Sequence, residues 1–306
     1  MKIKNNSYQK YFFLVLFIIY HQNILQAQET LEPEDELIEN VFNYGILING
    51  QTTEITPKGA FEFRIQHRFG GLDLKDFGNT VVQEFLGFDG SANIRFGFTY
   101  PVTDNFQLGI GRTKIGKTYD IEGKYRFIRQ KENGTPITVA LYFNAGIFST
   151  DFPEVGPNEF FEDFETPFEY KFAHRITYST QFLVSKKIGD NLSLELNPTF
   201  IYKNLVPSTN DNLTIAASLG GRLKTGITSS ILFEIGSKFN NREDSYRPPI
   251  SLAYEMGTAG HAFQLIISST NQILDQSVYT TLPLDYTDGK LLIGFNIKRT
   301  FWNGNN

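Results

Sequence analysis

The sequence predicts an all-β protein, namely an antiparallel up-and-down transmembrane β-barrel of about 12 strands. Three features of the chain favour this fold. From about residue 58 onward, apolar and polar residues alternate with the two-residue period of a strand. The connections between the expected strands alternate between short and long. The chain also begins with a segment typical of exported proteins.

The first residues form a basic and then apolar segment. Three lysines precede the unbroken apolar run of residues 11–20 (YFFLVLFIIY). A run of about ten residues is too short to cross a bilayer as a helix, and it is typical of a signal-peptide core. We therefore expect a signal peptide over residues 1–27, with cleavage after Ala27. A short membrane anchor is the alternative.

The composition excludes several classes of function. The chain has 306 residues, of which 41% are hydrophobic and 15% aromatic, so it is not a disordered chain and it favours strands. It has no cysteine, which excludes disulfides and thiolate metal sites, and only four histidines. A net charge of −5 gives no electrostatic footprint for nucleic acid. We expect no cofactor, no metal and no nucleic-acid partner.

The two-residue period is clearest in residues 60–69. The odd-numbered positions hold Phe, Phe, Ile, His and Phe, and the even-numbered positions hold Ala, Glu, Arg, Gln and Arg. The same test along the chain predicts strands whose boundaries are uncertain by roughly 2–4 residues. They lie near residues 59–69, 92–100, 106–113, 118–128, 137–148, 172–186, 192–204, 212–224, 230–239, 250–257, 261–270 and 290–301.

The connections between these strands alternate in length. Short turns rich in Asn, Asp and Gly, such as 101–105 and 187–191, alternate with longer segments such as 70–91 and 149–171. The connection 114–117 is an exception, because it is short where a long loop is due. Short turns on one side and long loops on the other are typical of bacterial outer-membrane barrels, whose turns face the periplasm. An even number of strands then places both termini in the periplasm.

The alternation does not by itself say whether the apolar face contacts lipid or a dry core. In a soluble sandwich the apolar face would be buried. A membrane barrel is favoured by the small and charged residues of the polar face, by aromatic residues near strand ends where girdles lie, and by the export signal. An exported soluble β-sandwich that acts as a binding module is the alternative.

In a membrane barrel the polar face lines the lumen, where bases outnumber acids. An excess of positive charge favours small anions in an open pore. A closed interior whose charges form internal salt bridges is the alternative. The predicted lumen-facing residues are Glu62, Arg64, Arg68, Arg95, Asp120, Glu122, Lys124, Arg126, Arg175, Glu195, Lys203, Arg222, Lys224, Glu234 and Glu255.

Two acidic segments and two glycines call for separate interpretations. Residues 29–39 form either a mobile periplasmic tail or a short acidic helix that plugs the lumen. The second acidic segment is the loop Asp151–Glu169, which holds seven acids and no base. We expect a solvated surface loop there rather than a calcium site. Gly109 and Gly111 are expected either to leave room for bulky neighbours in the lumen or to allow bends in the strand.

The function expected from these patterns is that of a non-enzymatic outer-membrane protein, either a narrow channel for a small solute or a scaffold. A membrane-embedded lipid hydrolase is the alternative, because His67 and His174 lie near the predicted rim. Such an enzyme needs a serine beside the histidine, and the spacing of Ser149 and Ser179 predicts no such contact.

Several stretches together resemble an uncharacterised family of predicted bacterial outer-membrane β-barrels. The resemblance begins near residue 46, at Ile46–Gly50 (ILING), and its most specific part is Phe61–Gly70. It implies the fold and the location but no activity. If Ile46–Gly50 belongs to the pattern, the segment before the barrel is docked and is not a loose tail. The further stretches are Gly87–Arg95, Leu108–Thr113, Lys117–Asp120 and Arg299–Trp302.

The expected organisation is therefore a signal peptide over residues 1–27, an acidic N-terminal segment (tail or plug) over 28–57 and an outer-membrane β-barrel over 58–302. The last strand, 290–301, is similar to the terminal strand by which outer-membrane barrels are recognised for insertion. The expected partners are thus outer-membrane lipid, the barrel-insertion machinery and a small solute of unknown identity.

Overall fold

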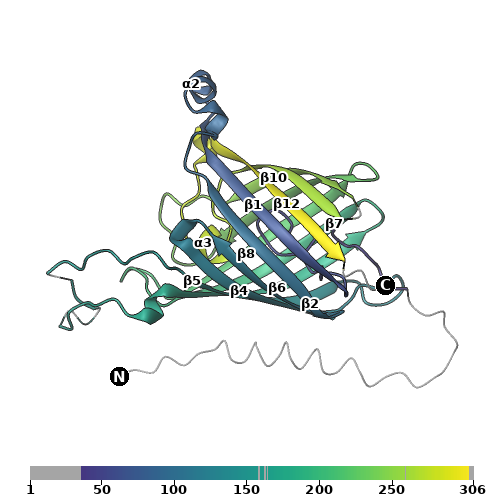
Figure 1. Cartoon of the computed structure of the whole chain (residues 1–306), viewed down its shortest axis with the longest axis horizontal. Helices are drawn as coiled ribbons and strands as arrows, with labels where there is room; N and C mark the ends of the chain where they lie inside the picture. Colours follow the sequence, from purple (N-terminus) through teal and green to yellow (C-terminus); the bar gives the residue numbers. More distant parts are fainter. Residues whose placement is uncertain (1–35, 158, 162, 164, 259, 303–306) are drawn as a thin grey trace. The chain divides into compact units, whose positions relative to one another are not determined.

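The computed structural model describes residues 36–302 except 158, 162, 164 and 259, so the predicted signal peptide and residues 28–35 lie outside the described residues. Twelve antiparallel strands form one closed barrel, in which every strand pairs with its neighbours in sequence (Figure 1). The barrel closes where β1 (Ala60–Asp73) pairs with β12 (Lys290–Trp302). This confirms the predicted up-and-down barrel.

The predicted strands correspond closely to the observed ones. The bounds of β3, β4 and β10 are as predicted, whereas β1 continues four residues beyond its predicted end at residue 69. The other strands are β2 (Asn93–Thr103), β3 (Phe106–Thr113), β4 (Thr118–Ile128), β5 (Thr138–Ile147), β6 (Ile176–Ile188), β7 (Leu192–Lys203), β8 (Leu213–Lys224), β9 (Ser229–Lys238), β10 (Ile250–Gly257) and β11 (His261–Ser268).

One predicted strand start is wrong. Residues 172–175 form the 3-10 turn η4 (Phe172–Arg175), and β6 begins only at Ile176. The turn is held locally, because His174 N donates to Lys171 O at 2.9 Å and Lys171 N donates to His174 Nδ1 at 3.1 Å. These local bonds replace the strand pairing that the apolar pattern alone had suggested.

The remaining helical elements are short and lie in the connections. None of the helices among the described residues is long and apolar enough to span a membrane. They are α2 (Phe77–Val82), η2 (Phe85–Gly87), η3 (Ile115–Lys117), α3 (Asp275–Val278) and η5 (Tyr286–Asp288).

The apolar side chains of the strands point outward and the polar side chains point inward. Phe98 on β2 is 45% exposed, whereas Arg95 on the same strand is 2% exposed. Aromatic rings stack across strands on the outer face, as in the pair Phe61–Phe301, whose centroids are 4.7 Å apart. A soluble sandwich would show the reverse, so the sandwich alternative is wrong, and the prediction that the polar face lines the lumen is confirmed.

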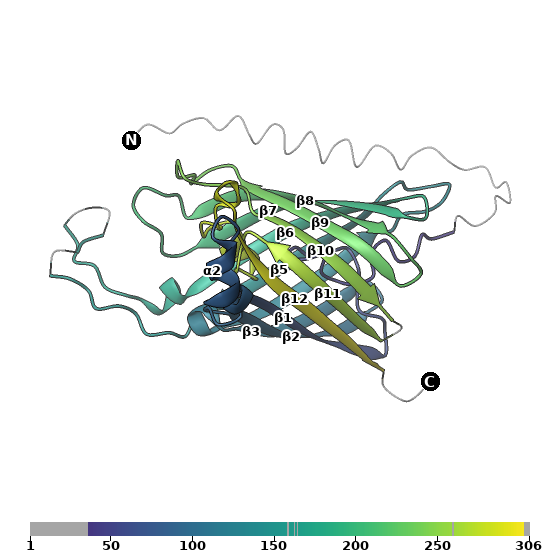
Figure 2. The ribbon, with the colours of Figure 1, turned by 90° about the horizontal axis from the view of Figure 1, so that it is seen from above.

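The two ends of the barrel differ. At one end, here the terminal end, β1 begins and β12 ends, with Ala60 paired to Trp302. Short turns join the strands there. The opposite end, here the loop end, carries α2 and the long connection between β5 and β6 (Figure 2). The short connection η3 belongs to the loop end, as the sequence pattern had suggested.

Two segments outside the sheet fill the interior. Residues 41–56, here the lumen hairpin, are largely buried, although they precede the first strand. Residues 269–280, here the inward loop, leave β11, form α3 and are almost entirely buried before the chain returns to β12. The described part of the N-terminal segment contains no helix.

Candidate functional site: the barrel lumen

The lumen hairpin packs against an apolar patch on the lumen wall. Its turn is closed by backbone hydrogen bonds from Leu47 N to Gly50 O at 2.9 Å and from Thr52 N to Gly45 O at 3.0 Å. Burial of apolar surface stabilises the packing of the hairpin against β9, β10 and β11. The contact comprises Val41, Phe42, Leu47 and Ile48 of the hairpin and Leu232, Ala253 and Ile266 of the wall.

A buried carboxylate binds the tip of the hairpin. Glu234 on β9 accepts hydrogen bonds from the backbone N–H groups of Ile48, Asn49 and Gly50, at 3.3, 3.0 and 3.1 Å. Arg68 on β1 donates to Ile48 O at 3.2 Å and to Asn49 Oδ1 at 2.9 Å. The wall thus satisfies both the donors and the acceptors of a turn that has no sheet partner.

Lys124 holds the base of the hairpin in a similar way. Its ammonium donates to the backbone carbonyls of Gly45 and Thr52, both at 2.8 Å, and of Glu54 at 3.2 Å. Three carbonyl acceptors match the three protons of an ammonium group. Lys124 and Arg68, which the sequence assigned to the lumen, are therefore engaged by the hairpin and do not face open water.

A second group of predicted residues forms a buried cluster of ion pairs between β1, β2, β4 and β12. Arg95 Nη2 lies 2.5 Å from Asp120 Oδ2 and 3.1 Å from Glu122 Oε2. Arg64 pairs with Glu122 and lies 3.4 Å from Glu62. Lys298 completes the group, at 2.6 Å from Glu62. Acids and bases are equal in number in this cluster, which therefore adds no net charge to the lumen.

Glycines leave the space that these side chains occupy. A Cβ atom on Gly109 would lie 2.6 Å from Glu122 Cγ, and one on Gly111 would collide with the Arg95 guanidinium. The prediction that both glycines admit bulky lumen neighbours is confirmed. Gly220 on β8 has the same role toward the hairpin, because a Cβ atom there would collide with the Leu47 side chain.

The inward loop narrows the barrel near the loop end. Val278 and Tyr279 pack against Ile201 and Ala216 of the wall. A hydrogen-bond chain joins this loop to the hairpin, running from Asn49 through Ser251 and Ser268 to the carbonyl of Thr270. Asp275 of α3 is buried, and burial raises the pKa of its carboxyl to about 7.

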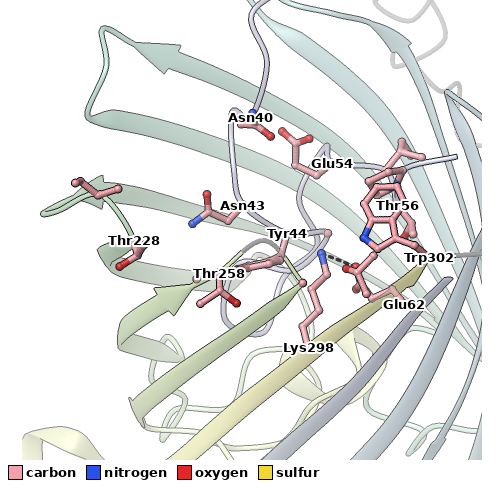
Figure 3. A pocket seen from close by; sticks show the side chains of 17 residues that line it. Asn40, Asn43, Tyr44, Glu54, Thr56, Glu62, Thr228, Thr258, Lys298 and Trp302 are labelled. Carbon is pink, nitrogen blue, oxygen red and sulfur yellow. Dashed lines mark ion pairs between the residues drawn. The ribbon is translucent and has the colours of Figure 1, made fainter. Parts of the chain in front are cut away.

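One pocket remains at the terminal end. It has a volume of about 410 Å³ and lies between the hairpin and the ends of β1 and β12 (Figure 3). Tyr44 of the hairpin points toward the ion pair of Lys298 and Glu62, with the ammonium 4.2 Å from the Tyr44 ring centroid. Burial is the main cause of a raised pKa for the Tyr44 hydroxyl, so this group is neutral at physiological pH.

A second pocket, here the loop pocket, lies at the loop end. It has a volume of about 290 Å³ and is bounded by the inward loop and by the rims of β3, β4, β6 and β7. The lumen hairpin and the inward loop are both buried inside the barrel, between these two pockets.

The structure divides the predicted lumen residues among several environments. Glu62, Arg64, Arg68, Arg95, Asp120, Glu122, Lys124, Glu195, Glu234 and Glu255 are buried. Arg126, Arg175, Lys203 and Arg222 are half-buried, and Lys224 is exposed at the end of β8. Arg222 lies 3.7 Å from Glu255, which also accepts from Asn43 of the hairpin at 2.7 Å. The residues therefore do not form one continuous basic surface.

Sequence reasoning missed the apolar patch that receives the hairpin. A signal was present in the sequence. Leu232 lies two residues from Glu234 on β9, so its side chain is on the polar face of the strand, which points into the lumen. Ile266 lies in the same way two residues from Gln264. An apolar side chain on the lumen-facing side of a strand indicates an apolar partner inside the barrel.

The histidines of the hydrolase alternative are not arranged for catalysis. His67 stacks on Phe295 on the outer face, with ring centroids 5.0 Å apart. His174 Nδ1 accepts from the backbone of Lys171 in the turn η4. Ser179 is buried inside the barrel. Among the described residues, no hydrogen bond joins a serine to either histidine, and no group of His, Cys, Asp and Glu is placed to hold a metal.

Residues 42–301 match the family described as "Membrane bound beta barrel domain" (DUF5777). The chain belongs to this family. The matched region starts within the lumen hairpin and ends near the end of β12, so the family pattern includes the hairpin together with the barrel. No curated protein matches the chain.

This chain is similar in fold to several solved outer-membrane barrels. The KdgM porin is 8% identical with a TM-score of 0.45, and the alignment covers 79% of this chain and 99% of that one. Omp33 of Acinetobacter baumannii is 11% identical with a TM-score of 0.40, covering 82% and 100%. Outer membrane phospholipase A from Escherichia coli is 10% identical with a TM-score of 0.40, covering 89% and 94%. At these identities the similarity concerns the fold alone.

Proposed function

We propose that this family member is an exported, non-enzymatic outer-membrane protein that acts as a narrow channel for a small solute. In this proposal, residues 1–27 are a signal peptide, insertion machinery places the barrel in the outer membrane, and both termini face the periplasm. The exposed apolar belt and the buried polar interior support the membrane location. The lumen hairpin and the inward loop make the described conformation a closed one.

The observation that carries the proposal is the way in which the hairpin is held. Its backbone bonds to side chains of the wall, such as Glu234 and Lys124, and not to the backbone of a barrel strand. It can therefore leave the lumen without breaking any pair of the closed sheet. A plug that is separate from the sheet, with a pocket at each end of the barrel, suits a gated channel better than a rigid scaffold.

A reversible cross-link tests this proposal. Thr53 Oγ1 of the hairpin lies 2.6 Å from Ser185 Oγ on β6, and the chain has no cysteine of its own. In the Thr53→Cys/Ser185→Cys variant, a disulfide should stabilise the closed arrangement by about 2–4 kcal/mol. We expect an open probability in planar bilayers that is at least roughly tenfold lower than for wild type, and restored by a reducing agent.

The single variants Thr53→Cys and Ser185→Cys are the controls, because neither can form the bridge. Equal conductance in the oxidised and reduced double variant would show that the hairpin does not gate the barrel. A wild-type protein that passes no current at any voltage would reject the channel and leave a scaffold.

A further inference from the structure

The loop pocket has mainly apolar walls, with a few polar side chains contributed by both the barrel and the inward loop. Thr113 of β3, Lys203 of β7 and Gln276 of α3 line it, beside apolar side chains such as Phe148 and Leu205. Its volume of about 290 Å³ is at the lower end of the range for small-molecule sites. The pocket therefore suits a single small molecule, with polar groups that fix its orientation.

Lys203 brings a positive charge that no acid neutralises. Its ammonium donates to Thr280 Oγ1 at 2.5 Å, and it forms no salt bridge with any of the described residues. The nearby base Lys238 repels the Lys203 ammonium, but Lys238 itself forms a salt bridge with Glu243, 2.8 Å away. An ammonium group has three protons, so Lys203 keeps donors for a ligand. A half-buried cation in this position favours an anionic group.

Two of the residues that line the pocket, Thr113 and Gln276, each have a buried oxygen atom without a partner. Thr113 is 3% exposed and Gln276 is 2% exposed. Neither Thr113 Oγ1 nor Gln276 Oε1 has a hydrogen-bond partner among the described residues. The amide nitrogen of Gln276 is already engaged, because it donates to Asn144 Oδ1 at 2.5 Å. Buried polar atoms are rarely left unpaired, so these two oxygens, on residues that line the pocket, are the acceptors open to a hydroxyl donor.

We propose that the loop pocket binds a small hydroxylated carboxylate. The carboxylate would pair with Lys203, and the hydroxyl groups would donate to Gln276 Oε1 and Thr113 Oγ1. This inference deepens the proposed channel function by naming the class of solute that enters from the loop end. A neutral polyol lacks the anionic group, and a simple carboxylate lacks the hydroxyl donors, so both should bind more weakly.

Isothermal titration of the purified full-length protein in detergent with sodium gluconate tests the proposal. We expect saturable binding by wild type, and at least roughly tenfold weaker binding by Lys203→Gln, which loses a charge-assisted hydrogen bond. Lys203→Arg should keep most of the affinity because it keeps the charge. Lys224→Gln is the matched control, since it removes a lysine that is exposed at the other end of the barrel.

The second variant, Thr113→Val, nearly preserves side-chain shape and removes only the hydroxyl. It should weaken gluconate binding several-fold without changing the binding of acetate. Sorbitol and acetate serve as the neutral and the unhydroxylated probes. Absence of saturable gluconate binding, equal affinity in Lys203→Gln, or equally tight binding of sorbitol would each overturn the proposal. Binding without conductance would reject the channel but not the site, so the two proposals fail separately.

Discussion

Replacing Gly220 by valine should open the barrel, by displacing the lumen hairpin from the wall. Gly220 lies on β8 between Glu195 and Glu234 of the neighbouring strands. A side chain there would collide with Leu47 of the hairpin. Valine favours strands, so the barrel itself should tolerate the change. Overpacking of this kind costs about 1–3 kcal/mol, which corresponds to a roughly five- to 150-fold increase in the open population.

A compensating variant separates displacement of the hairpin from general damage. Leu47→Ala removes as many carbon atoms as Gly220→Val adds, so the double variant should return the single-channel open probability to near the wild-type level. Leu47→Ala alone leaves a cavity and should also favour opening. Additive effects in the double variant would contradict direct contact between these two residues. The measurement is single-channel recording at one fixed voltage.

The second large effect is expected at Glu122, the centre of the buried ion-pair cluster. Glu122 contacts Arg64 and Arg95, and it accepts from the Tyr142 hydroxyl at 3.1 Å. In Glu122→Gln, two buried guanidinium groups lose the charge that both contact. Removing one partner from such a buried group destabilises a protein by about 3–5 kcal/mol. We expect a loss of this size in the free energy of unfolding, measured by urea titration in lipid vesicles.

Glu84→Gln is the matched control, because Glu84 is an exposed acid in the connection after α2 and forms no salt bridge among the described residues. Its effect should be within about 0.5 kcal/mol of zero. A loss below about 1 kcal/mol in Glu122→Gln would mean that water reaches the cluster and replaces the lost contacts. That result would favour an open lumen in place of a packed one.

The strands could be predicted because their signal is local. In β1 the alternation of Phe63, Arg64 and Ile65 fixes both the period and the face of each side chain. The prediction for β6 was wrong at its start, because apolar residues of the turn η4 continue the same pattern. Periodicity cannot separate a strand from a short turn whose own side chains satisfy its backbone.

The pairing of lumen charges could not be predicted, because it depends on the closed geometry. Arg64 and Glu122 lie 58 residues apart in sequence, and Arg68 and Asn296 lie 228 apart. Without the register of each strand, the sequence gives only a set of inward-facing charges. An excess of bases therefore suggested an anion-favouring pore, whereas several of those bases bind the hairpin or acids of the wall.

The lumen hairpin has no strand-like alternation, and only the resemblance at Ile46–Gly50 indicated a docked segment before the first strand. Its tip, Ile48–Gly50, is held by Glu234, Arg68 and Asn296, which come from three different strands. Such a contact leaves no periodic pattern in the hairpin itself. The local signs that an apolar partner lies inside were Leu232 on β9 and Ile266 on β11, two apolar residues at positions whose side chains point into the lumen.

Spin labels along β11 provide the most direct test of the central claim, that apolar side chains face lipid and polar ones face the lumen. The chain has no cysteine, so a single cysteine can carry the label at each position from 262 to 267. Phe263 and Leu265 are 45% and 62% exposed, whereas Ala262 and Gln264 are 3% and 4% exposed. In vesicles, labels at 263, 265 and 267 should collide strongly with oxygen, which concentrates in lipid, and labels at 262, 264 and 266 should not. Labels that are shielded from oxygen at 263 and 265 but reached by a water-soluble nickel chelate at 264 and 266 would contradict the claim.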